Sequence, residues 1–548
     1  MEFLLLFALP FVASMLGLEE DENDESDVTL LDQFEDRYLS VHAEAVSSFE
    51  GTGQIVSDDM FGTNAIFAVN TDAGVPNETF VEALDVFDVE NLRFPAGQAE
   101  GQDWQVEGQD WVDITVLSDD GTLRVELTNF LDSVDGSVTL TIPTTNAPLD
   151  GYGKHFAQWA QTVMEQYGDK IDAIEIGNEY WTHMDEVEYG QKANIAVSAI
   201  ANGIEAAEGA DADILVQMAS PNAQSAFGNS VDSRSYGVRT EEANQTIIDQ
   251  FDEAAKSEID GVVEHYYWSQ SADPFDDNNA EVNFMNVDIA VWDANFDQEL
   301  DFHITEWNLR TSTDDTNGMQ GVGILVEMVE NMVELGVDSA NVWPIVHNST
   351  VDLGEPADSG EVRTDDDGRV IHTVRGAVFD LMSHSLPGME LINLDLETVN
   401  DDFEIAAYEQ DGQFTFYIWN NSMTPQGIPV DLTEILPDFQ GATGVQVGYD
   451  SETSDGRIYS PTERSMIDAQ SVMIEGQPYY INEHDTGAVL TDHIFNMPEF
   501  NVTLNPFEII EIKAWQSDAK KGPPFLAGPS FSKTLVAYCG MSPVRPST

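Results

Sequence analysis

The sequence has few basic residues and almost no cysteine. Twenty Lys and Arg stand against 101 Asp and Glu, which gives a formal net charge of −81 at pH 7. Such a negative field repels phosphate backbones and anionic lipid headgroups, so neither nucleic acid nor a membrane is expected as a partner. The single cysteine, Cys539, excludes an intrachain disulfide and a cysteine-rich zinc site.

Two catalytic signatures are missing as well. No HExxH motif occurs, although the chain has 10 His, and no GxSxG elbow follows a strand-like run. A catalytic metal and a serine hydrolase are therefore not expected, and the chemistry considered below needs no cofactor.

The acidity favours a protein adapted to salt. At molar ionic strength the Debye length falls to about 3 Å, so crowded surface carboxylates stop repelling one another while they still hold water and cations. The alternative is a secreted protein with many weak Ca²⁺ sites. The sequence contains no GGxGxDxUx repeat and no complete EF-hand loop, which leaves calcium binding open.

The N-terminus begins with an apolar segment at residues 1–18, followed by acidic residues. An apolar run of this length is short for a membrane span and fits the core of a signal peptide, although Glu2 stands where a positive flank is expected. We therefore expect an extracellular or periplasmic protein by a route that stays open. Residues 19–58 read as an acidic linker that contributes a strand to a later sandwich.

Residues 59–386 alternate short β-rich runs with longer amphipathic runs. Eight strand-like phrases occur in chain order, namely TNAIFAV, ENLRFP, VTLTIP, IDAIEIGN, DILVQMASP, GVVEHYYW, LDFHITEWN and SANVWPIV. Helical periodicity lies between them, for example in KHFAQWAQTVMEQYG and GVGILVEMVENMVELG. This alternation predicts an α/β protein with a (β/α)₈ TIM barrel. An open doubly wound sheet would place a glycine-rich phosphate loop after the first strand, and none is present.

The remaining segments differ from this pattern. Residues 111–129 are predicted as a hairpin inserted between barrel strands. Residues 387–516 change to a period of two, which predicts a C-terminal antiparallel β-sandwich. Residues 517–548 have an atypical composition with no acid after Asp518, and we expect a disordered tail without a function.

Candidate catalytic residues follow from the barrel. Catalytic groups in this fold lie at the carboxyl ends of the strands, and two strand-like phrases end in carboxylates. IEIGNEYW places Glu179 after the fourth strand, and FHITEWN places Glu306 after the seventh. Trp181 and Trp307 follow closely and offer aromatic faces for sugar rings and an apolar wall that raises the pKa of the acid.

Two facing glutamates are what retaining glycoside hydrolysis requires, with carboxyl groups about 5–5.5 Å apart. Glu179 would then be the general acid/base and Glu306 the nucleophile. Two alternatives remain open. An inverting hydrolase would separate the carboxyl groups by about 6.5–9.5 Å, and an inactive carbohydrate-binding barrel would hydrolyse nothing.

The chain resembles the clan A glycoside hydrolases, in particular families 51, 39 and 79. The resemblance rests on Asn-Glu in IEIGNEYW, on Glu306 in HITEWN and on Arg93 in NLRFPAG. It implies a retaining glycosidase that acts on a polysaccharide or oligosaccharide, with Asn178 bonded to the 2-hydroxyl of the sugar and Arg93 holding Glu306 ionised. LRFPAG and TEWN are similar to the family 51 arabinofuranosidases.

The same resemblance implies four further substrate-binding positions. His265 and one of Tyr266 and Tyr267 would reach the site from VEHYYW, and Trp343 in NVWPIV would form a floor for the sugar, with a buried core tryptophan as the alternative. Trp181 would add a stacking face. Family 51 members usually have Arg after this His, and this chain has Tyr266 instead, which weakens an assignment to arabinofuranosides. The sugar, its anomer, endo or exo action and the oligomeric state stay open.

Overall fold

The computed structural model describes residues 44–99, 112–145, 148–220, 225–228, 230–268, 280–310, 317–347, 350–354, 370–396, 402–460, 462–483 and 486–516. The predictions for residues 1–18, for the acidic segment up to residue 43, for Trp111 at the start of the predicted hairpin, and for the tail lie outside these residues. Within them, no helix combines the length and the apolar character needed to cross a membrane.

The predicted TIM barrel is present. Eight parallel strands close on themselves in the order β10-β11-β2-β5-β6-β7-β8-β9. In chain order the strands are β2 (Gly62–Asn64), β5 (Asn91–Phe94), β6 (Ser137–Ile142), β7 (Ile171–Ile176), β8 (Asp213–Gln217), β9 (Gly261–Trp268), β10 (Asp301–Leu309) and β11 (Ser339–Val342). Each of them overlaps one of the eight predicted phrases, because a strand buried on both faces reads as a short apolar run.

A longer helix follows every barrel strand. These helices are α3 (Glu78–Phe87), α4 (Val125–Ser133), α5 (Phe156–Tyr167), α6 (Glu186–Ala206), α7 (Tyr236–Ile248), α9 (Ala280–Asp293), α10 (Gln320–Glu334) and α11 (Val374–Ser385). Their apolar faces cover the strands, as in α10, where Val322, Leu325, Val329 and Met332 are buried. The hydrophobic effect on these stripes therefore closes the outer layer of the barrel.

Two local predictions were wrong. The first strand ends at Asn64, and the apolar residues after it form the short helix α2 (Phe67–Asn70). The described part of the predicted hairpin at residues 111–129 contains a turn at Gly121, with φ of 81°, but no strand pairing, and α4 starts at Val125. The turn at Gly121 is therefore followed by a helix and not by a second strand.

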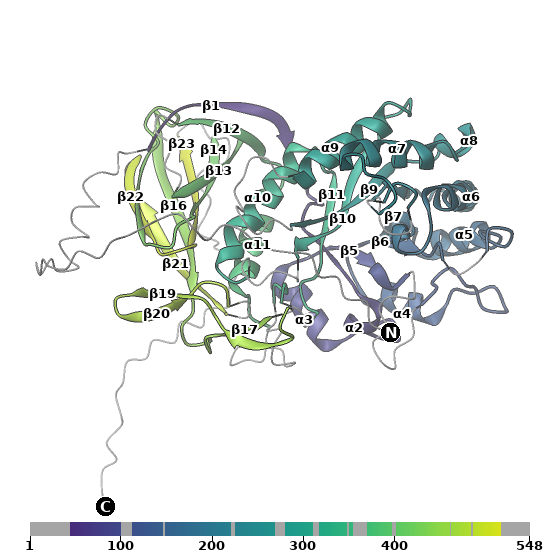
Figure 1. Cartoon of the computed structure of the whole chain (residues 1–548), viewed down its shortest axis with the longest axis horizontal. Helices are drawn as coiled ribbons and strands as arrows, with labels where there is room; N and C mark the ends of the chain where they lie inside the picture. The colour runs from purple at the N-terminus through teal and green to yellow at the C-terminus, as the bar shows by residue number, and fades with distance from the viewer. Residues whose placement is uncertain are drawn as a thin grey trace, which may run out of the picture. The chain divides into compact units, whose positions relative to one another are not determined.

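The C-terminal region is a nine-stranded sheet in the order β21-β16-β23-β14-β13-β12-β1-β15-β22. Its strands are β1 (Glu44–Ile55), β12 (Glu390–Leu396), β13 (Phe403–Gln410), β14 (Gln413–Asn420), β15 (Gln426–Asp431), β16 (Phe439–Tyr449), β21 (Ala488–Phe495), β22 (Glu499–Leu504) and β23 (Ile509–Gln516). The N-terminal β1 lies beside β12 (Figure 1), so the predicted extra strand is present. Pairing is antiparallel except between β1 and β15, which are parallel.

Strand β14 shows why this sheet has two buried faces. Phe414, Phe416 and Ile418 belong to a core that includes apolar side chains of β15 and β22, which gives the region its sandwich character. Trp419 belongs instead to the core shared with the barrel helices, where its ring leaves no room for a side chain at Gly323 of α10. Successive residues of a strand point to opposite faces, so one strand serves both cores.

Candidate active site

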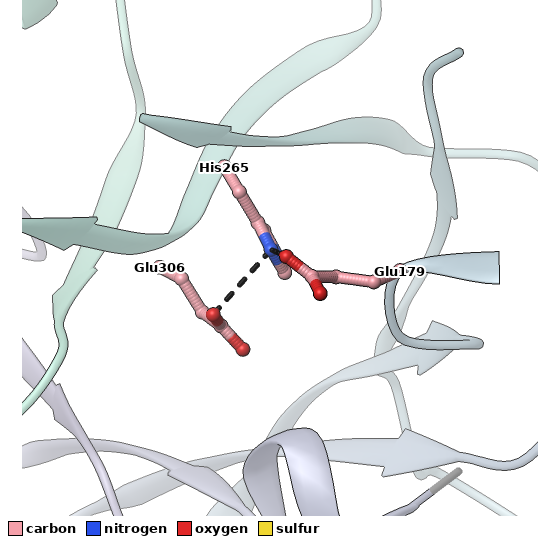
Figure 2. A group of neighbouring side chains, drawn as sticks. All are labelled: Glu179, His265 and Glu306. Carbon is pink, nitrogen blue, oxygen red and sulfur yellow. Dashed lines mark hydrogen bonds and ion pairs between the residues drawn. The ribbon is translucent and has the colours of Figure 1, made fainter. Parts of the chain in front are cut away.

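Four barrel strands carry polar side chains to one end of the barrel. Glu179 follows β7, His265 lies on β9, Glu306 lies on β10, and Arg93 lies on β5. Parallel strands that close into a barrel bring their carboxyl ends together, so residues far apart in the sequence meet there. Figure 2 shows Glu179 and Glu306 directed toward the imidazole of His265 from two sides.

The backbone after β7 turns Glu179 into the cleft. Gly177 has φ of 87°, and Glu179 itself has φ of 46° and ψ of 48°. The left-handed region costs a residue with a Cβ about 1–2 kcal/mol, so the surrounding contacts must hold it. The backbone amide and the hydroxyl of Thr182 both donate to the carbonyl oxygen of Glu179, each at 2.9 Å. The Glu179 side chain is left 35% exposed.

A register shift positions Glu306. The pairing of β10 with β9 slips between Ile304 and Glu306. A slip of this kind lets two successive side chains turn to the same side of a strand. Thr305 donates to Glu175 inside the barrel at 3.3 Å, and Glu306 bonds Arg93 in the same interior. Glu306 is 6% exposed and lies deeper than Glu179.

The two candidate carboxylates lie close together. Nδ1 of His265 is 3.3 Å from Oε1 of Glu179 and 3.5 Å from Oε2 of Glu306 (Figure 2). One carboxylate oxygen from each glutamate and the imidazole nitrogen all lie within 4.8 Å of one another. The same trio has the composition of a metal site, but the guanidinium of Arg93, 2.7 Å from Glu306, disfavours a second cation there by charge repulsion.

Arg93 is the hub of the network below the cleft. Its Nη1 donates to Oε1 of Glu306 at 2.7 Å and to Asn64 at 3.0 Å. Its Nε and Nη2 donate to the two oxygens of Glu175 at 2.6 and 2.9 Å, and Nη2 also donates to Asn178 at 2.7 Å. Burial acts to lower the pKa of Arg93, but the charges of Glu175 and Glu306 raise it, so the guanidinium stays charged.

Electrostatics set the protonation of the cleft. Burial acts to raise the pKa of Glu179, but the hydrogen bond and charge of His265 and the charge of Arg93 outweigh it, and the net pKa lies below the ordinary value. The expectation that aromatic walls raise this pKa was therefore wrong for the free protein. Burial acts to lower the pKa of His265, but Glu306 and Glu179 raise it. The two glutamates thus stabilise a proton on the imidazole.

The two tyrosines of VEHYYW have different surroundings. The hydroxyl of Tyr267 donates to Oε2 of Glu306 at 2.8 Å. Tyr266 is 1% exposed and its hydroxyl accepts from Asn331 of α10, so it packs between strand and helix and not in the cleft. Of the two candidate tyrosines, Tyr267 therefore lies in the site and Tyr266 does not, because adjacent residues of a strand point to opposite faces.

We expect Tyr267→Phe to lower kcat by about 10- to 100-fold, because a hydrogen bond to a charged group contributes about 1.5–3 kcal/mol. Tyr266→Phe is the matched control, with the same chemical change one residue away, and should leave kcat within about twofold. Steady-state kinetics of both variants check this. Equal losses in the two variants would contradict the assignment of Tyr267.

The cleft above the carboxylates has a volume of about 530 Å³. It is lined by Gly97, Asn178, Glu179, Trp181, Thr182, Ser220, Glu264, His265, Tyr267, Glu306, Arg310, Trp343 and Val351. Trp343 is 8% exposed and packs on Ile66 and Ala96, so it is both a cleft wall and a core side chain. Trp307, in contrast, is fully buried against Phe379 and offers no stacking face to the cleft.

Sequence reasoning missed two acidic residues near the cleft. Glu175 lies inside the apolar phrase IDAIEI and forms an ion pair with Arg93 within the barrel. Its signal is the alternation with Ile174 and Ile176, which places its side chain on the opposite, inner face. Glu264 lines the cleft, and burial raises its pKa to about 7. His303, three residues before Glu306 in the sequence, lies at the other end of the barrel.

No family model and no curated protein matches the sequence. Solved structures are similar in fold. An α-L-arabinofuranosidase from Thermotoga maritima, solved with arabinose, is 14% identical with a TM-score of 0.51, over 86% of this chain and 99% of that one. A family 51 α-L-arabinofuranosidase from Bifidobacterium longum is 10% identical with a TM-score of 0.53 over the same shares. A bifunctional glucanase-xylanase from a metagenome library is 11% identical with a TM-score of 0.51, over 87% and 99%.

These structures share the barrel and its accompanying sheet with this chain. The chain therefore has the fold of the clan A glycoside hydrolases. Identities of 10–14% describe the fold alone, and the chemistry has to be argued from the residues in the cleft.

Proposed function

We propose that the protein is a retaining glycoside hydrolase that cleaves a polysaccharide or oligosaccharide, with Glu179 as acid/base and Glu306 as nucleophile. The observation that carries this proposal is the approach of their carboxylate oxygens to within 4.8 Å of each other across an open cleft. So close an approach of two oxygens favours the about 5–5.5 Å separation of carboxyl groups in retaining enzymes over the about 6.5–9.5 Å that an inverting enzyme needs for its water.

The different surroundings of the two carboxylates support their different roles. Glu306 is buried and accepts hydrogen bonds from Arg93 and Tyr267, which fix the orientation of its carboxylate for attack on an anomeric carbon. Glu179 lies at the cleft, where a leaving oxygen can reach it. Attack by Glu306 forms a glycosyl-enzyme while Glu179 protonates the leaving oxygen, and Glu179 then deprotonates the water that releases the sugar.

His265 supplies a route for the proton. In the free protein the imidazole holds the proton beside both carboxylates. A sugar that enters the cleft brings no charge that could take the place of this proton. Transfer along the 3.3 Å contact from Nδ1 to Oε1 leaves Glu179 as the neutral acid that the first step needs. Asn178, whose amide orientation is fixed by Arg93, is positioned for the 2-hydroxyl, and Trp181 and Trp343 for the sugar faces.

A panel of aryl glycosides assayed in high salt tests the proposed function. We expect hydrolysis of at least one neutral glycoside, and the anomer of the first product, read by NMR, to match that of the substrate. An inverted product would contradict the retaining mechanism. Binding of oligosaccharides without hydrolysis of any member of the panel would support a carbohydrate-binding barrel instead.

A further inference from the structure

A second cavity opens at the opposite end of the barrel, where the strands begin. It has a volume of about 400 Å³. Its lining is rich in acid and includes Asp59, Asp172, Asp211, Asp213, Asp301, His303 and Asp338. In this fold the catalytic residues lie at the other end of the barrel, so a ligand here would contribute to stability rather than to catalysis.

Three of these side chains converge. Asp213 starts β8, Asp301 starts β10, and His303 lies two residues further along β10. One carboxylate oxygen from each aspartate and one ring nitrogen of His303 all lie within 4.8 Å of one another. The cluster therefore spans two strands that are separated by β9 in the barrel.

Two neighbouring acids have hydrogen-bond partners, whereas none is seen for the three converging side chains among the described residues. Asp338 accepts from the amide of Phe302 at 2.8 Å, and Asp260 accepts from the amide of Ile214 at 2.9 Å. No side-chain hydrogen bond joins Asp213 or Asp301 to any other residue in the described ranges. The first two acids hold the backbone, whereas the carboxylates of the cluster are available to a ligand.

His303 supplies the independent indication of a ligand. Its side chain is 8% exposed and lines the cavity, and its Nε2 is fully buried without a hydrogen-bond partner among the described residues. A buried polar nitrogen without a partner costs about 1–3 kcal/mol. Burial lowers the pKa of His303 to about 4, so the imidazole is neutral near pH 7 and can donate a lone pair.

Gly261 on β9 lies against two members of the cluster. It pairs in register with Leu215 of β8 and with Asp301 of β10. A Cβ at this position would stand 2.7 Å from the carbonyl oxygen of Asp301 and 3.2 Å from Cδ2 of His303. Any larger residue would therefore press on the backbone of Asp301 and on the ring of His303.

Negative charge is crowded at this end of the barrel. Burial and the charges of Asp260 and Asp301 raise the pKa of Asp213 to about 6. Arginine and lysine are absent from the described lining of the cavity, so no basic side chain there compensates these acids. A bound cation would relieve the repulsion that the fold otherwise sustains.

We propose that Asp213, Asp301 and His303 bind one divalent transition-metal ion, Mn²⁺ or Zn²⁺, at the amino-terminal end of the barrel. A set of one imidazole and two carboxylates suits these ions, whereas Ca²⁺ and Mg²⁺ prefer oxygen ligands throughout. The ion would join β8 to β10 across β9 and stabilise the closed barrel. Because this end faces away from Glu179 and Glu306, the site is independent of the proposed catalysis.

Mn²⁺ binding to the whole protein tests the proposal. In 1 M KCl, which screens diffuse attraction to surface acids, we expect one Mn²⁺ per chain by equilibrium dialysis after treatment with a chelator. Pulsed EPR of the bound ion should show coupling to one histidine nitrogen. At a free concentration of 100 times Kd, the Tm should rise by about 3 °C.

Variants separate this site from general acidity. Asp301→Asn, at a partly exposed position, should weaken Mn²⁺ binding at least 10-fold without unfolding the protein, and His303→Gln should abolish the nitrogen coupling. Asp119→Asn, which removes an exposed acid elsewhere, is the matched control and should bind as the wild type does. Equal affinity in Asp301→Asn, a missing nitrogen coupling in the wild type, or an equal rise in Tm with Ca²⁺ would each overturn the proposal.

Discussion

Glu306→Ala is expected to lower kcat by about 10⁴-fold or more, because without the nucleophile no glycosyl-enzyme can form and little of the machinery can act alone. Glu306→Gln should lose as much, since an amide keeps the shape and the hydrogen bond to Arg93 but cannot attack an anomeric carbon. Steady-state kinetics on the best aryl glycoside from the panel measure both variants. A loss of kcat of this size in both variants would support Glu306 as the nucleophile.

The fold of these variants has to be tested separately, because Glu306 is one of two acids paired with Arg93. Breaking a buried ion pair can cost about 3–5 kcal/mol when a charge is left without compensation. Glu175 still holds Arg93 through two hydrogen bonds, so we expect the Glu306 variants to remain folded.

A matched control for the loss of a buried acid is Glu508→Gln. Glu508 is 5% exposed in the turn between β22 and β23, where it accepts from Gln446 and Asn505. This variant should keep kcat within about twofold while its Tm changes. A folded Glu306→Ala protein with kcat near that of the wild type would refute the assignment of the nucleophile.

The candidate site was largely predictable because of where its residues stand along the strands. Glu179 and Glu306 each follow a short apolar run, and the carboxyl ends of the runs meet in a closed barrel. The spatial approach of the two carboxylates follows from that rule alone. Their depth does not, since it depends on the left-handed turn at Glu179 and on the register shift before Glu306.

The missed residues show where the sequence signal is ambiguous. Glu175 lies within a strand whose inner face is expected to be apolar, and its reason for being there is Arg93, 82 positions earlier. Tyr266 and Tyr267 could be told apart only by the pleat, which a sequence fixes to within one residue at best. The apolar residues after Asn64 fit a strand and a helix equally well, and the structure makes them helical.

The pKa of Glu179 could not be predicted from the neighbouring aromatic residues. The apolar wall was expected to raise it, and burial does act in that direction. His265, on a strand two positions away in the barrel, reverses the direction of the pKa shift of Glu179. A charge brought in by the fold thus outweighs a local apolar environment, because an imidazolium within hydrogen-bond distance favours the ionised carboxylate.

Glu179→Ala should show the second large effect, and its dependence on the leaving group identifies the acid/base. For a substrate with a poor leaving group, kcat/KM should fall by about 10³- to 10⁴-fold, because protonation of the departing oxygen is lost. For a dinitrophenyl glycoside, which departs without a proton, kcat/KM should change by less than about tenfold. Release of the sugar then becomes slow, since no base activates water.

Azide distinguishes this role from a merely structural one. A small anion can occupy the space left by the Glu179 side chain and attack the glycosyl-enzyme without a general base, so added azide should restore turnover at least tenfold. The product should be a glycosyl azide with the anomeric configuration of the substrate, because two displacements at the same carbon retain it. With Glu306→Ala, azide could only attack directly from the vacated side and would give the inverted anomer. An inverted azide from Glu179→Ala would exchange the roles of the two glutamates.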